Sequence, residues 1–217
     1  MKGVLILGAA ALVVATPLAA QISSSASGFS DAPTQADKTE YWLMMNEMGA
    51  CVAANKGEQA RQFVGSVIDS TGEAEAFDRL FHPQRNPCMR NFVMAGMLRS
   101  HARGVIAEGL FERLPDDALS VRLGAMPVEQ AAIATLHDFA RCYATANPSQ
   151  AVALLKSTRV ATRGELDFVR TMAPDFASCL PTGRELKLKP TSVRFALAEA
   201  LYRLATGAPV ATIEKAS

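Results

Sequence analysis

Few residues in this chain could do chemistry, and none of them stands in a familiar catalytic pattern. The three histidines are His82, His101 and His137, and no two of them are four residues apart. A zinc protease helix needs such a pair together with a glutamate, and a structural zinc site needs clustered cysteines and histidines. The sequence also lacks Gly-x-Ser-x-Gly and a glycine-rich phosphate loop. It therefore predicts no catalytic residue, no cofactor site and no metal site.

Several charged residues and the cysteines recur later in the chain at a constant distance. An offset of 91 residues, applied without a gap, pairs fourteen identical residues. They are Cys51/Cys142, Ala53/Ala144, Gln59/Gln150, Ala60/Ala151, Ser66/Ser157, Thr71/Thr162, Phe77/Phe168, Arg79/Arg170, Pro83/Pro174, Cys88/Cys179, Arg103/Arg194, Ala107/Ala198, Glu108/Glu199 and Leu110/Leu201. Helix-hairpin solenoids repeat every 34 residues or so, a much shorter period. We therefore expect two tandem copies of one unit, packed about a pseudo-two-fold axis.

Each copy keeps two arginines and one glutamate among mostly apolar neighbours. These residues are Arg79, Arg103 and Glu108 in the first copy, and Arg170, Arg194 and Glu199 in the second. Arg103 and Glu108 are five positions apart, so they do not share one face of a helix well. A tertiary pair within each unit, such as Arg79 with Glu108 or Arg170 with Glu199, is therefore at least as plausible as a pair within the last helix. Such a partly buried ion pair would fix the packing of the last helix; the alternative is an anion or carboxylate site beside each disulfide.

The first twenty residues have the pattern of a secretory signal peptide. Lys2 precedes an apolar run over 3–14, and Thr16-Pro17 separates that run from the small pair Ala19-Ala20. The run is shorter than the roughly 20 residues of a membrane span. An uncleaved anchor is the alternative, but we expect a periplasmic or secreted protein with no stable membrane insertion after signal removal.

Charge limits the classes of partner. The chain has 22 Lys+Arg and 21 Asp+Glu, so removal of Lys2 with the signal leaves 21 of each. A chain without basic excess is poorly suited to nucleic acid or to an anionic membrane surface.

The cysteines fit an oxidising compartment. Four cysteines allow three pairings, but Cys51 and Cys88 have the same spacing as Cys142 and Cys179. The repeat therefore predicts the disulfides Cys51–Cys88 and Cys142–Cys179, each stabilising its unit by about 4 kcal/mol through loop closure. No Cys-x-x-Cys is present that would indicate a redox-active pair.

Capping signals and apolar periodicity predict a mostly α-helical protein. We divide the chain into a signal peptide (1–20), a flexible leader (21–36), a first unit of about four helices (37–114), a linker (115–127), a second unit (128–206) and a tail (207–217). The clearest predicted helices cover 38–55, 58–70, 74–81, 128–146 and 191–205. The segment 92–113 is either one helix or a strand over Phe92–Met97 followed by a helix from near Ser100. The second possibility comes from 184–190, which alternates polar and apolar residues, and the two strands could form a small ribbon between the units.

Two classes of function remain. The favoured hypothesis is a non-catalytic exported module that binds another exported protein or an envelope component. Its groove would lie between the units, flanked by Trp42, Met44, Met45 and Met48, although core filling is the simpler interpretation of these methionines. The alternative is a small-ligand-binding protein or hydrolase with its site at the same interface. Exposed apolar residues in that groove, without converging polar groups, would favour the first. His82 or His137 clustered with Glu or Asp in a closed pocket would favour the second.

Overall fold

The computed structural model describes residues 39–82, 87–89, 97–115, 133, 135–180 and 188–208. These residues form an all-α structure of eight α-helices and two 3-10 helices, without a β-strand. The first half of the chain contains α1 (Thr39–Asn55), α2 (Gly57–Gly65), α3 (Thr71–Phe81), η2 (Pro87–Met89) and α4 (Arg99–Phe111). The second half contains α5 (Leu136–Ala146), α6 (Pro148–Ser157), α7 (Arg163–Met172), η4 (Ala173–Cys179) and α8 (Pro190–Thr206). The elements therefore follow in the same order in both halves.

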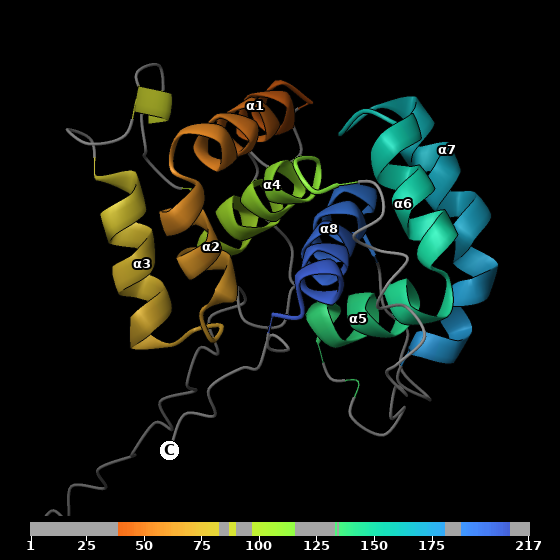
Figure 1. Ribbon diagram of the computed structural model, residues 1–217. Coiled ribbons are helices and arrows are strands. Elements are labelled where there is room, and N and C mark those ends of the chain that lie inside the picture. Colours follow the sequence, from red (N-terminus) through yellow and green to blue (C-terminus); the bar gives the residue numbers. More distant parts are fainter. Residues whose placement is uncertain are drawn as a thin grey trace, which may run out of the picture.

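Helices α4 and α8 lie side by side at the centre of the molecule, with α1–α3 on one side and α5–α7 on the other (Figure 1). They approach closely where Gly104 faces Phe195, because a Cβ atom on Gly104 would lie 2.3 Å from the Cβ of Phe195. These two residues are themselves related by the offset of 91. The contact therefore joins corresponding positions of the two halves.

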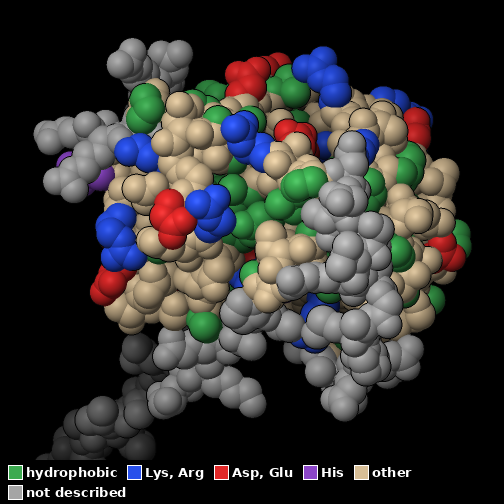
Figure 2. Space-filling model, viewed as in Figure 1, with side chains coloured by type: hydrophobic (Ala, Val, Ile, Leu, Met, Phe, Trp, Pro, Cys, Tyr) green, Lys and Arg blue, Asp and Glu red, His purple; other side chains and the backbone are tan. Residues whose placement is uncertain are grey.

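Both predicted disulfides are confirmed. Cys51–Cys88 ties α1 to η2, and Cys142–Cys179 ties α5 to η4. Disulfides are typical of an oxidising compartment outside the cytoplasm. Within the described ranges, no helix is both long and apolar enough to cross a membrane. Acidic and basic side chains are interspersed on the visible face of the molecule, in keeping with the balanced composition (Figure 2).

Helices α4 and α8 begin close to their predicted positions, whereas the predicted ribbon is not observed. Met97, Leu188 and Lys189 are described and are not in a strand, while 92–96 and 184–187 lie outside the described residues. Helix α8 ends before Gly207, which has a left-handed φ of 66°. Such a glycine ends helices without steric cost, as the sequence indicated.

Two helices differ from the prediction because a capping residue decides their ends. Helix α5 begins at Leu136 rather than Val128, since Thr135 caps it in a reciprocal capping box with Asp138. Helix α2 ends at Gly65 rather than Ser70, because Ser66 is extended and its N–H donates to the carbonyl oxygen of Phe63. Ser70 is instead the N-cap of α3 and accepts a hydrogen bond from the Glu73 N–H. Val67, which follows the end of this helix, is 41% exposed.

The gap-free repeat is wrong over one segment, where corresponding residues are 92 apart. Ser70 and Thr162 occupy the same N-cap position of α3 and α7. The residues before them, Asp69 and Ala161, share a left-handed φ of 60° and 56°. The cause is that α6 has ten residues and α2 has nine. The cysteines return to the offset of 91, so the alignment of Thr71, Phe77 and Arg79 with identical residues does not reflect their structural positions.

The two disulfides differ in exposure, and we predict that they are reduced in order. Cys51 and Cys88 are half-buried, whereas Cys142 and Cys179 are only 5% and 0% exposed. Since thiol–disulfide exchange requires access to a sulfur atom, brief treatment of the folded protein with a phosphine followed by alkylation should label Cys51 and Cys88 first. Peptide mass mapping over time checks this order. Labelling of all four cysteines at one rate would show that reduction requires global unfolding.

Candidate functional site

A network of buried arginines and glutamates joins the two halves through α4 and α8. Arg103 of α4 donates to Glu199 of α8 at 3.3 Å, and Arg194 of α8 donates to Glu108 of α4 at 2.6 Å. All four residues are at most 3% exposed. Each arginine therefore pairs with the glutamate of the opposite half. The two crossed pairs are equivalent, because the two arginines, like the two glutamates, are 91 residues apart in the sequence.

The pairing predicted within each unit is not observed. Arg79 lies on the surface 3.5 Å from Glu75, and Arg170 lies on the surface 3.4 Å from Asp167. Neither arginine is therefore the partner of Glu108 or Glu199. Their recurrence in the sequence does not mark a buried pair.

Two further buried glutamates, missed by the sequence reasoning, complete the network. Glu73 accepts hydrogen bonds from Nε and Nη2 of Arg103 at 2.9 and 2.7 Å. Glu165, which corresponds to it at the offset of 92, is 3.8 Å from Nε of Arg194. Both were hidden because the gap-free repeat aligned Glu73 with Gly164. The recurring signals Ser70-Thr71-Gly72-Glu73 and Thr162-Arg163-Gly164-Glu165 could have revealed the shifted register.

The two ends of the network differ in charge. Glu199 is four residues before Arg203, which donates to it at 2.9 Å, whereas the residue four after Glu108 is Glu112. Burial alone would raise the pKa of Glu199, but the charges of Arg103, His137 and Arg203 outweigh it and hold the pKa well below its usual range.

At the other end, carboxylates outnumber the arginine. Glu108, Glu112 and Glu165 lie around Arg194 alone. Burial raises the pKa of Glu112, and the negative charge of Glu108 raises it further. Burial is also the main cause that raises the pKa of Glu165 to about 7, and one oxygen of this carboxylate has no hydrogen-bond partner among the described residues.

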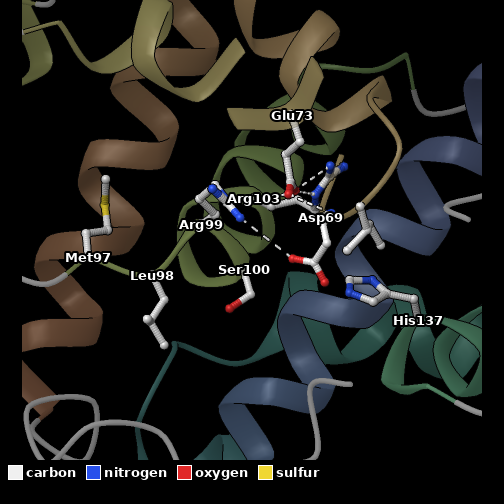
Figure 3. A pocket seen from close by; sticks show the side chains of 9 residues that line it. Asp69, Glu73, Met97, Leu98, Arg99, Ser100, Arg103 and His137 are labelled. Atoms are coloured by element: carbon white, nitrogen blue, oxygen red, sulfur yellow. Dashed lines mark hydrogen bonds and ion pairs between the residues drawn. The ribbon is translucent and has the colours of Figure 1, made fainter. Parts of the chain in front are cut away.

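A polar pocket of about 250 Å³ opens beside the arginine-rich end. Its described lining consists of Ile68, Asp69, Glu73, Met97, Leu98, Arg99, Ser100, Arg103 and His137. These residues come from the turn before α3, from α3, from the start of α4 and from the start of α5, so the pocket lies between the two halves (Figure 3).

His137 reaches the pocket because of where α5 begins. The capping box at Thr135 places His137 in the first turn of α5, and its Nδ1 lies 3.1 Å from Oε2 of Glu199. Since a carboxylate only accepts hydrogen bonds, Nδ1 carries the proton that joins these two groups. The other ring nitrogen is then left for the pocket, where the ring and the Asp69 carboxylate point toward one another (Figure 3).

Asp69 is placed by the strained turn between α2 and α3. Its backbone has φ 60°, and its N–H donates to Oε2 of Glu73 at 2.9 Å. Ala161 makes the same turn and the same hydrogen bond to Glu165. The strain therefore belongs to the fold, whereas the carboxylate is present only at Asp69. Oδ2 of Asp69 is buried and has no hydrogen-bond partner among the described residues, and burial together with Glu73 raises the pKa of the side chain.

The corresponding place in the other half does not have the charged groups or the imidazole. Asp69, Arg99, Ser100 and His137 correspond to Ala161, Pro190, Thr191 and Asn46, respectively. The first turn of α1 lies there instead, and the hydroxyl of Thr39 donates to the carbonyl oxygen of Ala161 at 3.5 Å. The buried arginines and glutamates are thus present in both halves, but Asp69, Arg99 and His137 of the pocket occur in one.

The remaining sequence candidates lie elsewhere. Trp42, Met45 and Met48 are buried in the core, which agrees with core filling, and only Met44 is exposed. Three of these four side chains therefore do not line an open groove. His82 is exposed at the end of α3.

His101 is packed among aromatic rings rather than at the pocket. Its Nδ1 lies 3.0 Å from the Tyr41 hydroxyl, and its ring contacts those of Tyr41 and Trp42. Burial lowers the pKa of His101 to about 4 and raises the pKa of Tyr41 to about 12. The imidazole is therefore neutral at physiological pH and forms a hydrogen bond with the Tyr41 hydroxyl.

The comparisons with known proteins leave the site to be judged on its geometry. No family model, no curated protein and no solved structure matches this chain. Among the residues that the structure describes, no group of three or more His, Cys, Asp or Glu side chains is arranged to hold a metal ion.

We predict that Glu199→Ala destabilises the protein by about 3–5 kcal/mol, because it removes a buried carboxylate that neutralises Arg103 and Arg203. Thermal and urea denaturation check this value. The matched control is Glu58→Ala, which removes an exposed partner of Arg61 and should leave the melting temperature almost unchanged. An unchanged melting temperature for Glu199→Ala would contradict the role of the crossed pairs in stability.

We predict opposite effects for Gln at the two corresponding glutamates. The folded-state pKa of Glu165 is about 7 against an ordinary 4.5, so the folded protein holds this proton more tightly and its stability falls as pH rises between these values. Glu165→Gln should remove that loss and raise the melting temperature at pH 8 more than at pH 5. Glu73→Gln should lower it at both pH values, because Arg103 loses a close charged partner. Parallel pH profiles for Glu165→Gln and the parent protein would contradict the prediction.

Proposed function

We propose that this protein is an exported binding protein for a small polar ligand, which it holds in the pocket formed by Asp69, Arg99, Ser100 and His137. The observation that carries the proposal is that Asp69, Arg99 and His137 occur in only one of two corresponding places, whereas the hydroxyl of Ser100 recurs at Thr191. A group needed for folding should be present in both halves, as Arg103/Arg194 and Glu108/Glu199 are. The extra polar groups are instead expected where one half has a separate role.

The pocket suits a small ligand in size and in chemistry. Its volume of about 250 Å³ is slightly below the roughly 300–1,000 Å³ of drug-sized ligand sites. It combines apolar walls from Ile68, Met97 and Leu98 with a few converging polar groups. This combination is typical of ligand pockets, in which apolar contacts supply affinity and polar groups supply orientation.

The burial of the methionines moves our preference from the protein-binding hypothesis to the ligand-binding one. The apolar groove expected beside Trp42 would need Met45 and Met48 at the surface, and both are in the core. Conversely, His137 is clustered with Asp69 and Glu199, as the ligand-binding alternative requires.

We favour binding over hydrolysis within this alternative. A hydrolase of the serine type needs a hydroxyl bonded to a general base. Ser100 is the hydroxyl of the described pocket lining, and no hydrogen bond joins it to His137. The ring of His137 is therefore assigned to ligand contact.

We infer further that the chain contains two tandem copies of one unit, related by a pseudo-two-fold axis near Gly104 and Phe195. The shared order of helices and the crossed ion pairs support this inference. A periplasmic or secreted location is supported by the predicted signal peptide together with the two disulfides.

A thermal-shift screen of the mature protein against small amines, organic acids, sugars and amino acids tests the binding function. A ligand at 100 times its Kd stabilises the folded state by about 2.7 kcal/mol, which should raise the melting temperature by about 5–10 °C. Asp69→Ala and His137→Ala should abolish the shift while remaining folded.

The matched controls are Asn46→Ala and Thr191→Ala, at the corresponding positions of the other half. Both should keep the full shift produced by any compound that binds. A shift that survives in Asp69→Ala and His137→Ala would place the ligand elsewhere, and the absence of any shift across the library would contradict the proposal.

A further inference from the structure

We propose that the ligand is a small α-amino acid-like zwitterion, whose ammonium group binds Asp69 and whose carboxylate binds Arg99. This inference rests on the proposed binding function of the same pocket and names the class of molecule that it takes. Opposite charges stand side by side on the pocket wall, where the Arg99 guanidinium and the Asp69 carboxylate lie next to one another (Figure 3).

Asp69 supplies the acceptor for an ammonium group. Its Oδ2 atom is buried without a hydrogen-bond partner among the described residues, although a buried carboxylate oxygen ordinarily has one. Oδ1 has only a long contact, 3.8 Å from Nη2 of Arg99. Because Oδ2 is buried while 22% of the side chain is exposed, Oδ1 is the oxygen that a donor of the ligand would meet. A charged donor would bind a carboxylate there most strongly.

Arg99 supplies the donors for a carboxylate. Its side chain is 40% exposed, and its two contacts with carboxylates, to Glu73 at 3.5 Å and to Asp69 at 3.8 Å, are longer than good hydrogen bonds. The neighbouring Arg103 differs, because its guanidinium nitrogens are all bonded to protein oxygens. Arg99 therefore has N–H groups left with which to bind a carboxylate, for which the planar guanidinium is well shaped.

The spacing of the two groups selects the ligand. Because Nη2 of Arg99 and Oδ1 of Asp69 are only 3.8 Å apart, the ligand must present its own two charges next to each other. An α-amino acid does so, since its ammonium and carboxylate are attached to one carbon atom. A molecule with one charge would engage only one of the two protein groups, and a zwitterion with distant charges could not reach both.

The other pocket residues fit the remaining parts of such a ligand. Met97, Leu98 and Ile68 provide an apolar surface for a small side chain. His137, held by Glu199 through Nδ1, presents its second ring nitrogen beside Asp69, where it can contact the ammonium group. The other half offers no equivalent, because Ala161 and Pro190 stand in place of the two charged residues.

Isothermal titration calorimetry of the mature protein with glycine, L-alanine and L-leucine tests this inference. We expect at least one of them to bind. The analogues of leucine that lack one charge, isopentylamine and 4-methylpentanoate, should bind at least tenfold more weakly than leucine, as should its isomer 6-aminohexanoate, whose charges are far apart.

Neutral variants assign each charge to its residue. Asp69→Asn should weaken binding of the amino acid at least tenfold and leave the weak binding of 4-methylpentanoate unchanged, whereas Arg99→Gln should affect 4-methylpentanoate and spare isopentylamine. Arg61→Gln, an exposed arginine on α2, is the matched control for a general loss of positive charge and should bind normally. Equal binding of the single-charge analogues, or an affinity unchanged in both pocket variants, would overturn the zwitterion assignment.

The outcomes separate this inference from the binding function beneath it. If none of the amino acids binds but another small compound gives a thermal shift that requires Asp69 and His137, the pocket binds a ligand of a different class and only the zwitterion assignment fails. If no compound of any class gives such a shift, both proposals fail.

Discussion

The structure depends on the exchange of two buried ion pairs between α4 and α8. Arg103 and Arg194 each donate to a glutamate on the opposite helix and to backbone carbonyl oxygens of their own half, Val64 and Leu154 among them. An arginine taken from water is stable only when most of its donors are bonded, and a carboxylate buried opposite it meets the same requirement. Glu108 is bonded by Arg194 of the other half, and Glu199 is bonded by Arg103 of the other half as well as by Arg203 and His137 of its own. The relative position of the halves is therefore fixed by charge as well as by apolar packing.

This shared network also explains how one region can differ without loss of the fold. At one end Glu199 is surrounded by positive or proton-bearing groups, and a polar pocket opens beside it. At the other end Glu112 replaces the position of Arg203, the carboxylates compete for Arg194, and the first turn of α1 lies against Ala161. The arginine and glutamate at the centre remain common to both ends. The differences lie in the residues around these central ion pairs, such as Arg203 and Glu112. They alter the local charge and space rather than the packing of the helices.

The sequence predicted the features that depend on local chemistry. Equal cysteine spacing led to the correct disulfides, and Ser70, Thr162 and Gly207 marked helix ends through capping geometry. The pairing of Arg103 with Glu199 and of Arg194 with Glu108 was missed because each pair joins opposite halves. An ion pair between two halves has no characteristic sequence spacing by which it could be predicted. Glu73 and Glu165 were missed because one extra residue in α6 shifts the register. Of the charges that repeat at the offset of 91, Arg103, Glu108, Arg194 and Glu199 join the two halves, whereas Arg79 and Arg170 lie on the surface. Asp69, Arg99 and His137 of the pocket do not repeat.

The close contact of Gly104 with Phe195 has a consequence for symmetry. If both positions carried the same residue, two phenylalanines would collide and two glycines would leave a void, so this crossing needs one small and one large residue. A dimer of identical chains cannot supply that difference. Joining both halves in one polypeptide allows corresponding positions to carry different residues, and the central contact is then already asymmetric before any ligand is considered.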